Sequence, residues 1–306
     1  MISRRSLLVL FATPALRGAD DGSWISKLGG QVRRDATGNV REVNLRGCWV
    51  SAAEILDLLQ YKKLARLNLS LTPIADSDLL YLRPAVQIED LNLGYAEHIT
   101  DIGLNVIKDW KALKRLDVAG TQVADATMTL LSGLTALESL DVAGGEVTDD
   151  GVKELLPLTN LRHLGLGRNQ VGEDACEVLG QMNNLQSLDL SGAGGRRARR
   201  GGGSERIPQP VVEAVSQLDE LRILRIGRSA ADSAALKRWA ASLKKLERLE
   251  LASCAQIDNS AVAVLEGWRS LKQVDLQGTA ATAARIAQLQ KSRPDMKVLA
   301  SATAAP

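Results

Sequence analysis

A short apolar pattern recurs ten times along this chain of 306 residues, and no other feature constrains the fold as tightly. The pattern is an apolar triplet spaced as L-x-x-L-x-L, and successive triplets begin 24, 24, 25, 24, 24, 24, 36, 25 and 25 residues apart. Such regular spacing predicts an array of similar units rather than separate globular domains. In chain order the triplets are Val40/Val43/Leu45, Leu64/Leu67/Leu69, Ile88/Leu91/Leu93, Leu113/Leu116/Val118, Leu137/Leu140/Val142, Leu161/Leu164/Leu166, Leu185/Leu188/Leu190, Leu221/Leu224/Ile226, Leu246/Leu249/Leu251 and Leu271/Val274/Leu276.

Each unit has two halves that differ in periodicity. The triplet half alternates apolar and polar residues, which predicts a strand. The other half has the apolar spacing of a helix. Examples of this helical spacing are Ile102, Val106 and Ile107 in one unit, and Val152, Leu155 and Leu156 in another.

A strand and a helix in 24 residues cannot bury their apolar faces alone, but stacked units can bury them against one another. We therefore predict an α/β solenoid, a right-handed arc with a parallel sheet on its concave face and helices outside. Capping residues support the helix starts, because Asp76, Thr100-Asp101, Thr148-Asp149 and Asp258 can accept hydrogen bonds from free backbone N–H groups.

Two units carry a longer motif. Leu137-Glu138-Ser139-Leu140-Asp141-Val142 leads into Val147-Thr148-Asp149-Asp150-Gly151-Val152, and another unit contains Ile99-Thr100-Asp101-Ile102-Gly103-Leu104. These residues resemble bacterial leucine-rich-repeat proteins, specifically the cysteine-containing (T-D-x-G-L type) subclass of ribonuclease-inhibitor-like solenoids. The resemblance covers residues 40–290 and implies a curved scaffold that binds a partner, with no catalytic residues. Ala231-Asp232-Ser233 and Ala281-Thr282-Ala283 lack the T-D pair, which predicts weaker helix starts there.

The ninth position of the unit carries two of the three cysteines, Cys48 and Cys254. They lie eight repeats apart, or about 38 Å at about 4.8 Å per strand. A disulfide requires Cα atoms within about 7 Å, so these two cysteines cannot pair within one chain. The third, Cys176, falls in a helical half.

Residues 1–19 have the pattern of an export signal, because Arg4 and Arg5 precede the apolar stretch 7–12. The run Ser3-Arg4-Arg5-Ser6-Leu7-Leu8 resembles a twin-arginine signal. The alternatives are an ordinary secretory signal and an apolar start retained in the membrane. We expect a protein exported to the periplasm, the cell envelope or the medium, or a cytoplasmic one if this segment is not a functional signal.

Behind the signal we expect three further segments. Residues 20–39 would form an N-terminal cap of a short helix and a hairpin strand, and residues 301–306 a frayed tail. The array would span residues 40–300, with an Arg/Gly-rich insertion at 192–209. No apolar run approaches the roughly 18 residues of a membrane span, so none is expected in the mature chain.

Side chains between the triplet positions point away from the core and would line the concave face. They form a polar stripe that predicts a groove for a basic or hydroxyl-rich protein partner. The alternative is that Asn or Asp at this position is simply the preference of this repeat type. The predicted partner-binding residues are Asn44, Asn68, Asn92, Asp117, Asp141, His163, Asp189, Arg225, Glu250 and Asp275.

Adjacent carboxylates at Asp117 and Asp141 raise the question of a cation site. At about 4.8 Å they would repel by roughly 0.9 kcal/mol in water and roughly 3.5 kcal/mol at an effective dielectric of 20. An open face is closer to the first figure, and we expect Arg115 nearby. The stripe also lacks oxygen ligands converging from a loop, so we predict no calcium or other metal site and no cofactor.

The insertion is basic. Arg196, Arg197, Arg199, Arg200 and Arg206 stand against one Glu, which gives this segment a charge of +4. Without residues 1–19 the chain carries −1, so the rest of the mature chain carries −5. One interpretation is contact with an anionic surface, and the alternatives are a tolerated, charge-solubilised insertion or a proteolytic site. Nucleic acid is disfavoured, because no aromatic residue interleaves the arginines to stack on bases.

Catalytic motifs are missing from the sequence. His98 and His163 have no neighbouring nucleophile motif, and the glycine-rich stretches match no phosphate-binding loop. We predict a protein that is not an enzyme.

Tryptophans offer a further candidate. Trp110 and Trp268 replace a recurring leucine and should be buried, whereas the exposure of Trp49 and Trp239 is left open. An exposed Trp49 would be a binding candidate.

The resulting functional hypothesis is an exported, non-catalytic scaffold that binds a protein across its concave face. A structural or envelope-associated protein that contacts anionic lipid or polysaccharide through the Arg-rich loop is the alternative. A weaker one is an intracellular adaptor of the ubiquitin-ligase type, although the sequence shows no attachment domain for that machinery. The ligand and the oligomeric state stay undetermined.

Overall fold

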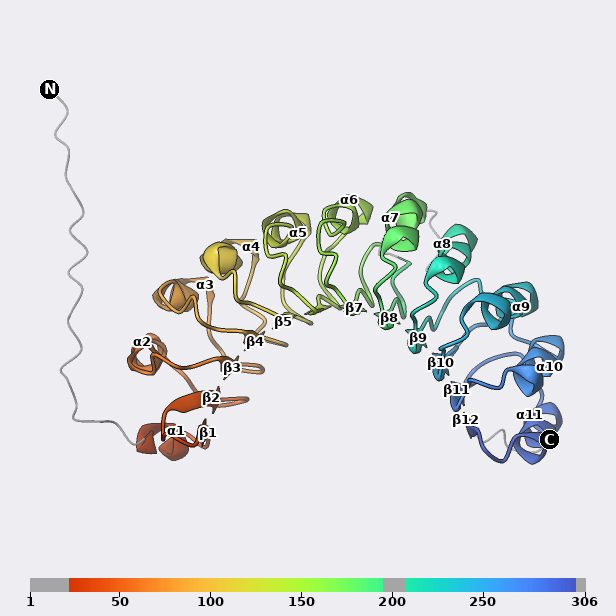
Figure 1. Cartoon of the computed structure of the whole chain (residues 1–306), viewed down its shortest axis with the longest axis horizontal. Coiled ribbons are helices and arrows are strands. Elements are labelled where there is room, and N and C mark those ends of the chain that lie inside the picture. Colours follow the sequence, from red (N-terminus) through yellow and green to blue (C-terminus); the bar gives the residue numbers. More distant parts are fainter. Residues whose placement is uncertain (1–21, 195–206, 301–306) are drawn as a thin grey trace, which may run out of the picture.

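The computed structural model describes residues 22–194 and 207–300, which form an arc with one twelve-stranded sheet in chain order (Figure 1). The first two strands pair antiparallel and all later neighbours pair parallel. The strands are β1 (Gln31–Arg34), β2 (Val40–Asn44), β3 (Arg66–Asn68), β4 (Asp90–Asn92), β5 (Arg115–Asp117), β6 (Ser139–Asp141), β7 (His163–Gly165), β8 (Ser187–Asp189), β9 (Ile223–Arg225), β10 (Arg248–Glu250), β11 (Gln273–Asp275) and β12 (Lys297–Leu299).

Helices cover the convex side of the arc, one layer outside the sheet (Figure 1). The α-helices are α1 (Ser23–Lys27), α2 (Ala52–Asp57), α3 (Asp76–Leu79), α4 (Asp101–Leu104), α5 (Asp125–Leu131), α6 (Asp149–Lys153), α7 (Cys176–Gln181), α8 (Gln209–Ala214), α9 (Ser233–Ser242), α10 (Asn259–Gly267) and α11 (Ala283–Ser292). Short 3-10 helices adjoin them at η1 (Leu58–Gln60), η2 (Leu80–Leu82), η3 (Asn105–Asp109), η4 (Glu173–Ala175) and η6 (Val215–Gln217).

The core lies between the sheet and the helices, where the triplets point. All thirty triplet residues are buried, none with more than 4% of its surface exposed. The middle residue of each triplet faces the same residue of the next strand, as Leu140 faces Leu164. The predicted α/β solenoid with a parallel sheet on its concave face is therefore confirmed. The predicted signal (1–19), the five insertion arginines and the tail (301–306) lie outside the described residues.

A left-handed turn follows every strand of the array. Two residues after each triplet, φ lies between 56° and 76° in all ten units. In this conformation the N–H group points into the next repeat, as Gly47 N–H donates to the Ser70 carbonyl and Gly144 N–H to that of Gly167. Glycine fills five of these positions because it has no Cβ to disfavour positive φ. These turns therefore add a backbone hydrogen bond between neighbouring repeats, just beyond the end of the strands.

The helix starts are tied together between repeats, which the sequence analysis did not predict. Thr100 and Thr148 accept from N–H groups of their own helices. The preceding aspartates instead reach into the next unit: Asp76 accepts from Thr100 N (2.8 Å) and Asp125 accepts from Thr148 N (2.8 Å). Asp101 likewise accepts from Ala124 N. Capping is therefore confirmed at Thr100, Thr148 and Asp258. It is wrong for Asp76 as a cap of its own helix, because the stacked register brings the free N–H group of Thr100 in the next unit within reach of its carboxylate.

This cross-repeat contact explains the glycine of the T-D-x-G motif. A Cβ at Gly103 would lie 2.2 Å from Asp76 Oδ1, and one at Gly151 would lie 2.2 Å from Asp125 Oδ1. The glycine leaves the space that the carboxylate of the previous repeat occupies.

Two details of the helical halves differ from the prediction. Ile102 is 76% exposed and Leu156 is 42% exposed, so neither belongs to the buried helix face. These halves are short α turns followed by 3-10 or irregular turns, so a regular helical period does not apply. The expected weakness of the starts of α9 and α11 is also wrong, because Asp232 and Thr282 cap both ten-residue helices.

Burial predicts the cost of truncating a triplet residue. Leu164→Ala should lower the free energy of unfolding by about 2–5 kcal/mol, because it opens a cavity between three strands. The matched control Ile102→Ala should change it by less than about 0.5 kcal/mol. Chemical denaturation followed by circular dichroism measures both, and equal costs would contradict the assigned phase.

The cross-repeat carboxylates predict a second difference. Gly151→Ala should destabilise the protein by about 1–3 kcal/mol, because its Cβ displaces the Asp125 carboxylate from Thr148. Gly133→Ala is the control, since a Cβ there meets no atom closer than 3.5 Å. Thermal unfolding compares the two variants, and a neutral Gly151→Ala would refute the role given to this contact.

Candidate functional site

The predicted concave stripe is a continuous row in the structure. Strand register aligns its central residues one to the next across ten neighbouring strands. His163 belongs to the adjacent row, between Ser139 and Ser187. The central row is Asn44, Asn68, Asn92, Asp117, Asp141, Gly165, Asp189, Arg225, Glu250 and Asp275.

Most of these side chains form a hydrogen bond within the turn that follows their strand, which the sequence did not predict. One side-chain oxygen accepts a hydrogen bond from the backbone N–H two residues later, as in Asn68 to Ser70 (2.9 Å) and Asp141 to Ala143 (2.9 Å). Asn or Asp fits this bond because its short side chain reaches the turn. The exceptions are Gly165, Arg225 and Glu250. The preference for Asn and Asp thus has a local cause, and only the second oxygen or the amide nitrogen is free for another purpose.

Ion pairs lie toward both ends of the concave face, although Asp275 in the last strand of the row has none among the described residues. Arg66 contacts Glu42 at 2.8 Å, and Arg225 contacts Glu250 at 3.1 Å. Arg115 pairs with Asp90 at 2.7 Å, on the side away from Asp141. Arg115 therefore bonds to the carboxylate of the preceding strand and forms no ion pair with Asp117 or Asp141.

Three carboxylates in the middle of the row lack a cationic partner. Within residues 22–194 and 207–300, no Lys or Arg lies within ion-pair distance of Asp117, Asp141 or Asp189. Burial raises the pKa of Asp117, and the nearby charges of Asp141 and Asp90 raise it further, against the hydrogen bonds from Ala119 N–H and the Asn92 amide. The central concave face is therefore acidic.

Gly165 interrupts this acidic stretch, and the Asp141 side chain covers it. A Cβ at Gly165 would lie 2.5 Å from Asp141 Oδ1, so the Asp141 carboxylate extends over the glycine. Asp189 stands on the other side of Gly165 and binds Ser191 N through Oδ1 at 2.8 Å. The exposed His163 imidazole lies in the neighbouring row. Together these residues offer hydrogen-bond acceptors and negative charge to a partner.

The tryptophan side chains differ in how far they are exposed to solvent. Trp110, Trp239 and Trp268 are buried, as expected for the first and third. Trp49 is 82% exposed, which makes it the binding candidate that the sequence left open.

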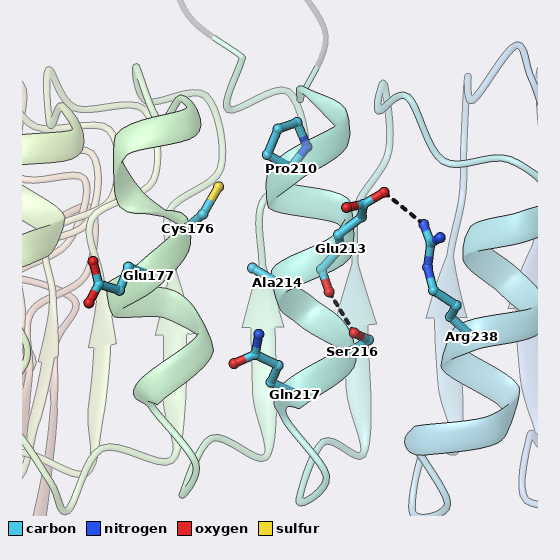
Figure 2. Close-up of a pocket in the computed structure, with 8 residues that line it drawn as sticks. All are labelled: Cys176, Glu177, Pro210, Glu213, Ala214, Ser216, Gln217 and Arg238. Atoms are coloured by element: carbon cyan, nitrogen blue, oxygen red, sulfur yellow. Dashed lines mark hydrogen bonds and ion pairs between the residues drawn. The ribbon is translucent and has the colours of Figure 1, made fainter.

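A hollow of about 420 Å³ lies on the convex side, between α7 and α8 and away from the concave row (Figure 2). Its lining includes Cys176, Pro210 and the Glu213–Arg238 ion pair. Burial first, and then the carboxylates of Asp149, Glu173 and Asp174, raise the pKa of Cys176 to about 11. The thiol is therefore protonated at neutral pH and is a poor nucleophile.

The described ranges contain no group of three or more His, Cys, Asp or Glu side chains arranged to hold a metal ion. Over the same ranges, every helix is too short or too polar to cross a bilayer.

The raised pKa of Asp117 gives a pH prediction. Because the folded state favours protonated Asp117, wild-type stability should fall as pH rises from 3.8 through the raised pKa. Asp117→Asn removes this loss and keeps an oxygen for Ala119 N–H, but it gives up the bond that Asp117 Oδ2 accepts from the Asn92 amide (2.9 Å). The variant should therefore lose less stability than wild type as pH rises over this range. Unfolding midpoints of both proteins across this range measure the difference, and a constant difference at all pH values would contradict the assignment.

Comparisons with known proteins agree with this geometry at the level of one repeat. The leucine-rich-repeat family model matches residues 133–156. An internalin from Listeria monocytogenes is similar in structure, with 19% identity, 93% of this chain and 94% of that chain covered, and a TM-score of 0.47. Internalin C2 from the same organism has 20% identity, 86% and 81% coverage, and a TM-score of 0.43. The comparison with curated proteins gives no match. The matched unit and the repeated strand–helix geometry together make this fold an α/β leucine-rich-repeat solenoid.

Proposed function

We propose that this protein is an exported, non-catalytic scaffold whose central concave face binds a basic protein partner. The supporting observation is the stretch formed by Asp117, Asp141 and Asp189, which lacks the ion pairs present toward both ends of the face. The second carboxylate oxygens of Asp141 and Asp189, which the turn hydrogen bonds do not use, suit a lysine or arginine side chain, which donates to carboxylates. His163 would border this contact.

The charge distribution along the chain supports the same partner. Residues 72–194 contain 19 Asp or Glu and eight Lys or Arg, a formal net charge of −11. Residues 22–71 and 207–300 each carry +4. A field of one sign over the middle of the arc attracts a basic partner and raises its association rate. The overall charge of +2 does not show this difference in net charge between the segments.

Three parts of the proposal rest on the sequence. Export rests on the pattern of residues 1–19. Assignment to the cysteine-containing repeat subclass rests on the T-D-x-G motif and on the buried ninth-position cysteines Cys48 and Cys254. The basic insertion would provide a separate contact with anionic lipid or polysaccharide, and its flanking residues Gly194 and Ile207 lie between β8 and α8.

A charge-only variant tests the concave site. Asp141→Asn combined with Asp189→Asn keeps the turn hydrogen bonds but removes two charges. With residues 20–306 as bait against a native envelope extract, this variant should lose the partner that wild type captures. The control pair Asp174→Asn and Glu177→Gln removes two charges from the convex side and should keep it.

The results distinguish binding by the concave face from binding by the insertion. Deleting residues 195–206 should leave the captured partner unchanged. An identical catch with the concave variant would refute the role of the acidic stretch. Loss of the partner with the deletion alone would assign binding to the insertion, and such binding should weaken steeply with salt.

A further inference from the structure

Three exposed apolar side chains lie on one edge of the first three repeats. Trp49 is 82% exposed, Tyr95 is 55% exposed and Leu71 is 47% exposed. Leu71 and Tyr95 occupy the left-handed turn position of adjacent units, and Trp49 follows that position in the first unit, at Gly47, by two residues. Backbone bonds from Gly47 to Ser70 and from Leu71 to Gly94 hold these turns side by side. We call Trp49, Leu71 and Tyr95 the apolar edge.

The fold does not account for these residue types. At the same turn position, five of the ten units use glycine, which adopts positive φ without steric cost. Leu71 and Tyr95 adopt it at φ 56° and 59° although large side chains disfavour it, and neither side chain is buried in return. Backbone preference and burial would both favour glycine or a polar residue here.

The Tyr95 ring is held in place. A Cβ at Gly120 in the next unit would lie 2.6 Å from Cδ1 of Tyr95, so the ring lies against that glycine. A ring fixed in this way loses little conformational freedom when a partner covers it. Tyrosine and tryptophan are also the side chains that most often anchor protein interfaces.

Charge identifies the kind of partner. Residues 22–71 contain eight Lys or Arg and four Asp or Glu. Three of these acids are already engaged: Asp35 with Thr37, Glu42 with Arg66, and Glu54 with Ser51.

Arg46 brings an unneutralised charge to the edge. Its Nη1 lies 3.2 Å from Ser70 Oγ, next to Leu71, and no carboxylate in the described ranges pairs with it. An acidic segment would meet this charge in the first two repeats. Tyr95 already lies within residues 72–194, whose net charge of −11 would repel the segment from the repeats that follow Tyr95.

We propose that the apolar edge and Arg46 form a second docking surface, for an acidic polypeptide segment that carries apolar side chains. This surface is separate from the central concave site and favours a partner of the opposite charge. The protein would therefore hold two different polypeptide segments at once, one acidic at its first repeats and one basic at its centre.

Two labelled peptides test the proposal by fluorescence anisotropy against residues 20–306. In one peptide leucine alternates with glutamate, and in the other it alternates with lysine. The glutamate peptide should bind, and Trp49→Ala should weaken its binding about tenfold or more, as loss of an interface anchor does. Asp141→Asn with Asp189→Asn should leave it unchanged, so this test does not depend on the concave proposal.

The left-handed turn provides a matched pair of variants. Leu71→Gly should weaken peptide binding without lowering the melting temperature, because it removes an exposed side chain from an unfavourable backbone. Ser253→Gly makes the same backbone change in a distant repeat, where φ is 62°, and should leave binding intact.

Four results would overturn the proposal. They are no binding of the glutamate peptide at millimolar concentration, equal binding of the lysine peptide, no effect of Trp49→Ala, and Trp49-dependent binding to vesicles of anionic lipid in place of the peptide. The last would assign the edge to a membrane surface.

Discussion

Burial of aliphatic side chains between neighbouring repeats is the constraint on which the whole structure depends. A single unit of about 24 residues contributes a short strand and one to about three helical turns, too little to enclose its own leucines. The units therefore stabilise one another, and the buried Leu140 lies between Leu116 and Leu164 of the neighbouring strands. The arc, its open concave face and its exposed turn edge all follow from this stacking.

Polar contacts between repeats fix the register of neighbouring units, which the burial of apolar side chains alone would not specify. The left-handed turns pass a backbone hydrogen bond to the next repeat at the sheet edge, and Asp76, Asp101 and Asp125 do the same near the helix starts. The repeats that carry these aspartates are thus fixed at two points, on either side of the apolar core. Two groups are not needed for these contacts and are therefore available to bind partners. They are the unpaired oxygens on the concave face and the bulky side chains at turns where glycine would be sufficient.

The sequence predicted the parts that depend on periodicity. Triplet spacing identified the buried residues, and with them the alignment of the residues from Asn44 to Asp275 on neighbouring strands; their role in binding stays a proposal. It did not reveal contacts between repeats, since the reach of Asp76 to Thr100 depends on how the helix starts stack. The sequence allows Arg115 to pair with a carboxylate of either neighbouring strand. Only its side-chain conformation in the structure places its guanidinium beside Asp90. Trp49 was recognised as a candidate, but its exposure follows from the path of the first turn, which no sequence period records.

Truncation of the array measures directly whether the stability of this protein comes from contacts between repeats. Fragments that begin at residue 20 and end at 87, 136 or 184 contain two, four and six repeats. Chemical denaturation of this series should show an unfolded or marginal two-repeat fragment and a free energy of unfolding that rises with each added pair. A two-repeat fragment as stable as the complete chain would show that the units do not need one another, and the account would be wrong.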